Sequence, residues 1–284
     1  MRFVIIAFIT IVSSFSAQAQ DAVRQLHPRY MHNAEVRHLD NSVTVTANAP
    51  RPLADSVKAL SEEYAWVIDF EDPQYYSKYD LVDDTDPKWR AANPTAKGFT
   101  LIAGDSFQTQ FPENPNAATS SAEEEHILEN VVSDYNASTN PGRFSVVSEG
   151  DGRFAIVGTQ VKDENGQNQA VSPILDTPIT VQTDTRDPFE TIQVILRALS
   201  TERQIKVVPG TGAFGGLRPQ PRVTVGGQNV PARILLLQTL SAAKMKLYWH
   251  LYYDNDVKSY ALNLLPLMKV EYDAAGNRTT VLVR

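Results

Sequence analysis

Residues 179–208 read ITVQTDTRDPFETIQVILRALSTERQIKVV, and this stretch decides the fold. It begins with alternating apolar residues, which is typical of a half-buried strand. A proline follows nine residues after the start, then a helical apolar pattern and a second β-rich segment. Residues 43–70 read VTVTANAPRPLADSVKALSEEYAWVIDF and repeat the same order, again with a proline after nine residues. The second helix is three residues longer, close to one turn. Such repetition predicts two copies of one small unit.

Each copy continues in the same way. The first continues with an interrupted strand over residues 99–111, a helix that starts at a Ser120 and Glu123 capping box, and a hairpin over residues 144–158. The second continues with a strand at residues 223–225, a helix opened by Pro231, and a hairpin over residues 247–264. The predicted fold class is α+β, with two small βαββαββ modules. Each module is expected to pack two helices on one face of a mixed sheet, and a C-terminal β-hairpin follows.

These patterns divide the chain into segments. They are a signal peptide (1–19), a flexible N-terminal arm (20–41), a first module (42–160) with a long insertion (71–97), a linker (161–175), a second module (176–265) and the C-terminal hairpin (266–284).

The first residues are typical of a leader that directs export. Arg2 precedes an apolar run that is too short for a permanent membrane span, and Ala17-Gln18-Ala19 is a small-x-small cleavage signal. We therefore expect cleavage near Ala19 and a periplasmic or secreted product without a transmembrane segment. An uncleaved membrane anchor is the alternative.

Composition narrows the function further. The chain has no cysteine, which excludes disulfides and thiolate metal sites. Its net charge is −7, and it becomes −8 when Arg2 leaves with the leader. Because phosphates need a basic footprint, nucleic acid is not an expected partner.

The modules resemble a known family. The segment from Ile179 to Leu264, with Val223-Thr224-Val225, the helix start Val230-Pro231-Ala232 and a closing hairpin, resembles the short N-terminal (STN-type) domain of secretins and TonB-dependent receptors. Residues 43–158 are similar to a diverged copy. The chain is also similar to uncharacterised exported bacterial proteins. No segment corresponds to the secretin pore domain or to an outer-membrane barrel, so the resemblance implies a periplasmic protein-docking module and not a channel.

The sequence contains no complete motif for catalysis, metal binding or cofactor binding. His27, His32 and His38 lie five and six residues apart, whereas helical metal pairs lie three or four apart. Residues 210–215 match the bare dinucleotide glycine pattern, but prolines follow where a helix would have to open. There is no Gly-x-Ser-x-Gly elbow. We predict no catalytic residue, no metal and no cofactor.

The insertion is the candidate binding site. Loops of this length are usually functional or disordered, and aromatic side chains are common anchors at interfaces. The alternative is that the aromatics only pin the loop onto its own module. The candidate binding residues are aromatic or acidic: Tyr75, Tyr76, Tyr79, Asp80, Asp83, Asp84 and Trp89.

The function expected from the sequence is non-catalytic binding to another envelope protein, in which strand addition to an exposed sheet edge is one mode. One alternative is an envelope-polymer hydrolase with its site in a cleft between the modules. The other is an assembly or regulatory partner of a secretion or uptake system.

Overall fold

A computed structural model describes residues 34–39, 41–113, 120–210, 221–242, 246–272 and 278–283. The predicted leader and residues 20–33 lie outside these ranges, as do His27, His32 and most of the glycine-rich segment after Gly210. Among the described residues, no helix combines the length and apolar character needed to cross a bilayer.

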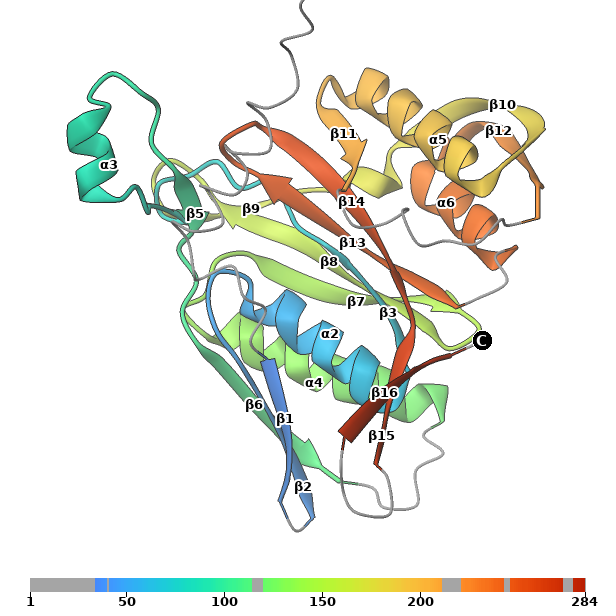
Figure 1. The fold of residues 1–284 in the computed structure, drawn as a ribbon, viewed down its shortest axis with the longest axis horizontal. Helices are drawn as coiled ribbons and strands as arrows, with labels where there is room; N and C mark the ends of the chain where they lie inside the picture. The colour runs from blue at the N-terminus through green and yellow to red at the C-terminus, as the bar shows by residue number, and fades with distance from the viewer. Residues whose placement is uncertain are drawn as a thin grey trace, which may run out of the picture.

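The first module contains seven repeated elements and one insertion (Figure 1). Strand β2 pairs antiparallel with β6, while β8 pairs parallel with β3 and antiparallel with β7. Helices α2 and α4 contact strands of both groups. The elements are β2 (Ser42–Ala47), α2 (Pro52–Tyr64), β3 (Val67–Glu71), β6 (Phe107–Pro112), α4 (Ser121–Ala137), β7 (Arg143–Gly150) and β8 (Arg153–Lys162).

The second module repeats this topology strand for strand. Strand β10 pairs antiparallel with β12, while β14 pairs parallel with β11 and antiparallel with β13. The elements are β10 (Pro178–Arg186), α5 (Pro188–Arg203), β11 (Lys206–Pro209), β12 (Val223–Pro231), α6 (Ala232–Ser241), β13 (Leu247–Asp254) and β14 (Ser259–Pro266). The first helix ends identically in both modules, on Ala65 at φ 59° and on Gln204 at φ 52°.

The α+β class is confirmed, but the single mixed sheet expected for each module is not what the structure has. Each module divides its strands between two sheets, and its first helix contacts strands of both. The predicted helical faces form the cores, with Leu53, Val57 and Leu60 buried in α2 and Leu128 and Val131 buried in α4. The predicted capping box of Ser120 and Glu123 is present.

The two modules share one sheet, which the sequence does not predict. Six of its seven strands follow the order β11-β14-β13-β3-β8-β7, three from each module, and a short strand of the linker pairs with β8 as the seventh. The junction is short: β13 runs parallel to β3 and pairs only His250 with Phe70 and Leu251 with Glu71. We call this junction, together with the charged side chains around it, the seam.

Strands also occupy segments that the sequence assigns to an arm and a linker. Residues of the predicted arm form β1 (Ala34–Leu39), which adds antiparallel to β2 because Val36 packs against the first core and His38 bonds to Glu63 and Glu113. The linker contains β9 (Asn168–Ala170), paired with β8, and the 3-10 turn η2 (Ile174–Asp176). The predicted C-terminal hairpin is β15 (Met268–Tyr272) with β16 (Arg278–Leu282), and β15 returns to contact α2 of the first module.

Candidate functional site

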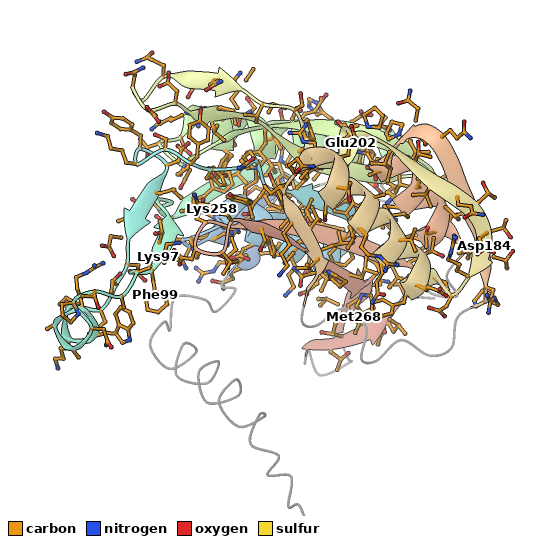
Figure 2. All side chains as sticks on the ribbon, turned by 90° about the horizontal axis from the view of Figure 1, so that it is seen from above. Lys97, Phe99, Asp184, Glu202, Lys258 and Met268 are labelled. Carbon is orange, nitrogen blue, oxygen red and sulfur yellow. The ribbon has the colours of Figure 1, made fainter. Side chains whose placement is uncertain are left out.

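The predicted insertion folds into a small hairpin that carries a helix. Strands β4 (Leu81–Asp83) and β5 (Thr100–Ile102) pair antiparallel, and α3 (Pro87–Ala92) lies between them. Asp86 caps α3 by accepting the backbone N–H groups of Lys88 and Trp89 at 2.7 and 2.9 Å. We call residues 81–102 the insertion hairpin. It extends from the body of the molecule, and no residue of α3 is buried (Figures 1 and 2).

Two of the predicted binding residues anchor the base of this hairpin. Tyr75 is 2% exposed and packs with Ile102 and Val161. Asp80 is fully buried, and one of its carboxylate oxygens accepts the backbone N–H of Lys162 at 2.7 Å. Burial raises the pKa of Asp80. These two side chains cannot reach a partner. They fix the loop to its own module, which is the alternative stated above to partner binding.

The other predicted residues lie at the surface. Tyr76 and Tyr79 are each 45% exposed, and the Tyr76 hydroxyl donates to Gln169. Asp83 forms an ion pair with Arg90, and hydrogen bonds from Thr85 lower the pKa of Asp83. The Trp89 ring packs against Phe99 at 5.1 Å between centroids, and the backbone N–H of Asp84 donates to the Phe99 carbonyl.

The insertion hairpin also contacts the second module. The Lys97 ammonium donates to the carbonyl of Asp256 in the β13–β14 turn, and the Thr100 N–H donates to the Asp256 carboxylate at 3.1 Å. A surface hollow of about 160 Å³ lies beside these contacts, lined mainly by residues 100–102 and 252–256. This volume is below the range of about 300–1,000 Å³ usual for small-molecule sites.

The seam gathers most of the buried charge of the described residues. Arg233 from α6 reaches Glu71 at 2.6 Å, Glu149 at 3.1 Å and Asp176 at 2.7 Å. Glu71 also accepts the backbone N–H of Leu175 at 3.1 Å. Burial raises the pKa of Glu71 to about 7, although Arg233 acts in the opposite direction.

Two further ion pairs bind the edges of β3 and β13 together. Arg153 holds Asp69 through two bonds of 2.7 and 2.8 Å, and Asp69 also accepts the backbone N–H of Trp249 at 2.7 Å. Arg51 holds Asp72 at 2.7 Å and donates to the carbonyl of Tyr253. Asp69 and Asp72 are 0% and 2% exposed. These carboxylates complete the short strand pairing, so their geometry is that of structural groups.

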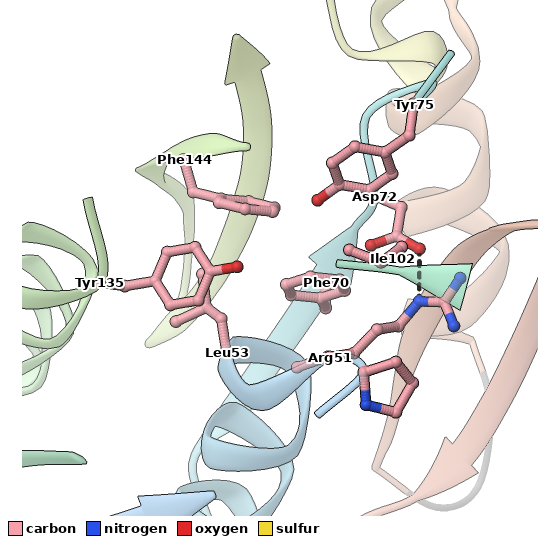
Figure 3. Close-up of a pocket in the computed structure, with 10 residues that line it drawn as sticks. Arg51, Leu53, Phe70, Asp72, Tyr75, Ile102, Tyr135 and Phe144 are labelled. Atoms are coloured by element: carbon pink, nitrogen blue, oxygen red, sulfur yellow. Dashed lines mark hydrogen bonds and ion pairs between the residues drawn. The ribbon is translucent and has the colours of Figure 1, made fainter. Parts of the chain in front are cut away.

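A small cavity lies next to the Arg51–Asp72 pair (Figure 3). Phe70, Tyr75 and Tyr135 contribute to its wall, and its volume is about 10 Å³. That is room for roughly one water molecule and not for a substrate. Within the described ranges, no three His, Asp or Glu side chains are grouped so as to hold a metal ion.

No protein-family model, curated protein or solved structure matches this chain.

Sequence reasoning missed the seam, although one signal was present. Residues 68–72 read IDFED, which places three acids in and directly after a strand that is otherwise apolar. Charged residues are almost never fully buried without a partner. Acids inside an apolar strand therefore indicate a buried ionic contact, here with Arg51, Arg153 and Arg233.

Proposed function

We propose that this chain is a non-catalytic docking protein of the cell envelope, and that the exposed part of its insertion hairpin contacts a partner protein. The observation that carries the proposal is that the insertion has a buried base and an exposed end. Tyr75 and Asp80 fix the base, whereas no residue of α3 in the hairpin is buried; Tyr76 and Tyr79, which precede the hairpin, are also exposed. A rigid base that presents aromatic side chains lowers the entropic cost of binding.

The packing of the hairpin against both modules supports the same proposal. Lys97 and Thr100 bond to Asp256, so a contact at the hairpin would be transmitted directly to the second module. The second module has a shorter connection at the equivalent position, between β11 and β12. The insertion is therefore not required by the shared topology.

The localisation belongs to the proposal as well. Export by the leader predicts a mature protein that begins at Gln20, in the periplasm or outside the cell. N-terminal sequencing of the protein from the cell envelope tests this. A start at Met1 would contradict it.

The hydrolase alternative lacks support at the seam. Its buried carboxylates are held by arginines at 2.6–3.1 Å and are closed to solvent, whereas an acid–base pair for glycan or peptide cleavage must reach its substrate. An assembly or regulatory partner of a secretion or uptake system is compatible with docking and would be recognised by the identity of the captured protein.

The test replaces the exposed part of the hairpin and keeps its base. Asp83 pairs with Thr100, so replacing residues 84–99 by Asn-Gly closes β4 and β5 as a two-residue hairpin. A photo-cross-linking residue at Tyr79 or Trp89 is expected to give one defined adduct in living cells, whereas the same residue at exposed Asp184 is not. Purified partner should then bind the wild type and not the shortened variant.

The control is the melting temperature of the shortened variant, which is expected to stay close to that of the wild type because α3 contributes no buried residue. Equal binding by the two proteins would remove the insertion hairpin as the docking surface.

A further inference from the structure

At the seam, β13 pairs with β3 through the edge that does not pair with β14. The backbone groups of Trp249, Leu251 and Tyr253 face β3. Leu251 accepts the N–H of Asp72 at 2.9 Å, and Tyr253 donates to the Asp72 carboxylate at 3.1 Å while its carbonyl accepts Arg51. This edge is thus filled by a parallel strand with an acidic residue directly after it.

The equivalent edge in the first module belongs to β7, and it is partly open. The repeat places Phe144, Val146 and Ser148 where Trp249, Leu251 and Tyr253 stand. The side chain of Asn136 bonds both the N–H and the carbonyl of Phe144, at 2.9 and 2.8 Å, which closes that end. Among the described residues, no partner bonds the outward backbone groups of Val146 or Ser148.

The other outer edge of the shared sheet is β11, and it is closed. β11 is the second-module counterpart of β3. The N–H of Val207 donates to the hydroxyl of Ser200 at 2.9 Å, and its carbonyl lies 3.2 Å from the same hydroxyl. The next outward residue is Pro209, which has no N–H to offer.

The first module lacks this closure. Ser61 occupies the position of Ser200, and its hydroxyl has no hydrogen-bond partner among the described residues. The strand after it, β3, is the one that accepts β13. Edges left open in a sheet invite a further strand, and proteins close those that must not be extended.

We propose that the outer edge of β7, at Val146 and Ser148, binds a strand of a different protein that contains a module with this same topology. This β3-type strand is the one that follows the first helix of its module, as β3 and β11 do here, and it binds in the parallel direction seen at the seam. A second copy of this chain has no such strand to give, because its β3 is occupied and its β11 is closed. The partner strand is expected to carry a side chain that accepts hydrogen bonds two positions after the residue that pairs with Ser145, as Asp72 follows Phe70. In the test below, Thr211 is the residue at this position, two after Pro209.

This inference rests on the proposed role in protein docking but uses a separate surface. The insertion hairpin lies between β3 and β6, and none of its residues contributes to the β7 edge. The two surfaces can therefore fail independently.

The test converts the chain itself into a probe. The double variant Ser200→Ala, Pro209→Val opens β11, which is the only β3-type strand of the described residues that is not already used. Its opened β11 should add to β7 of the next molecule, and such a head-to-tail contact that does not close gives open-ended assemblies. Sedimentation velocity up to about 1 mM protein, a range that detects weak association, measures the result.

The wild type is expected to stay monomeric over this range, whereas the double variant should at least roughly double its average mass. Adding Ser148→Pro should return it to monomer, because proline removes an outward N–H of β7. Adding Ser148→Thr keeps that N–H and should leave the assembly intact. Circular dichroism and melting confirm that each variant is folded.

Three results would overturn the proposal. The first is a folded double variant that stays monomeric at the highest concentration. The second is assembly that Ser148→Pro does not change. The third is a wild-type dimer abolished by Ser148→Pro, which would mean that β7 pairs with its own copy. The double variant carrying the shortened insertion hairpin should assemble equally, which separates this result from the test of the docking surface above.

Discussion

Replacing Arg233 by methionine tests how the seam holds the modules together. The Arg233 side chain is 7% exposed, and it contacts two carboxylates, Glu71 and Glu149, whose side chains are 1% and 2% exposed. Methionine fills a similar volume without charge or hydrogen-bond donors. Glu149 keeps Arg153 at 3.3 Å, so Glu71 is the buried carboxylate that is left without a cation, while the third contact, Asp176, is half exposed and contributes little.

The magnitude follows from this burial. Removing one partner of a buried ion pair typically costs about 3–5 kcal/mol, because the other charge stays buried without compensation. For a protein of this size, about 1 kcal/mol lowers the melting temperature by roughly 2–4 °C. We expect Arg233→Met to melt roughly 6–20 °C below the wild type at pH 8.

The loss of stability in Arg233→Met is expected to depend on pH, because Glu71 is a titratable group. Burial raises the pKa of Glu71 to about 7 with Arg233 present, and loss of Arg233 removes the attraction that lowers it. The folded state then holds the Glu71 proton more tightly than the unfolded state does. Its stabilising effect is present at low pH and is lost as the pH rises through the folded pKa. The deficit of Arg233→Met should therefore be smaller at pH 5 than at pH 8.

Thermal unfolding by circular dichroism at both pH values measures the effect. The double variant Arg233→Met, Glu71→Gln should recover part of the loss at pH 8, because it removes the stranded charge of Glu71. The reasoning is refuted if Arg233→Met melts with the wild type at pH 8, or if its deficit is the same at both pH values.

Three smaller effects follow from local geometry. Ala65 and Gln204 each occupy the left-handed region at a helix end, so glycine at either position should add about 1 kcal/mol in urea unfolding; a gain at one position alone would contradict their equivalence. Burial lowers the pKa of His38, but Glu113 and Glu63 outweigh it and raise this pKa above its usual value. The stabilising contribution of His38 should therefore be present below the unfolded pKa and vanish as the pH rises past the folded pKa. His38→Gln should thus lower the melting temperature at pH 5.5 and leave it unchanged at pH 9. Ser120→Ala removes the capping box of α4 and should cost about 1 kcal/mol, whereas Ser120→Asp should keep most of the stability.

The local part of the fold could be predicted from the sequence because its signals are local. Alternating apolar residues, the helical spacing of Leu53, Val57 and Leu60, and the capping residues each lie within a few positions of one another. The duplication could be predicted for the same reason, since both modules use one pattern. The α+β class follows from these elements.

The shared sheet could not be predicted because its evidence is sparse and distant. Only two residue pairs join β3 and β13, and they link positions 180 residues apart, Phe70 to His250 and Glu71 to Leu251. No periodicity encodes such a contact. Which of the candidate residues are buried could not be predicted from the sequence, since only their packing separates Tyr75 and Asp80 from Tyr76 and Tyr79.

The short parallel contact between the modules has a consequence for how the chain comes apart. Asp69 and Asp72 sit on one half of the molecule and accept backbone groups of the other half, and Glu71 depends on an arginine from the other half. Separating the halves would leave acids in an apolar surface with part of their hydrogen bonding gone. Duplication has therefore produced two folds that are alike but mutually dependent, and we expect them to melt in a single transition and neither half to survive expression alone.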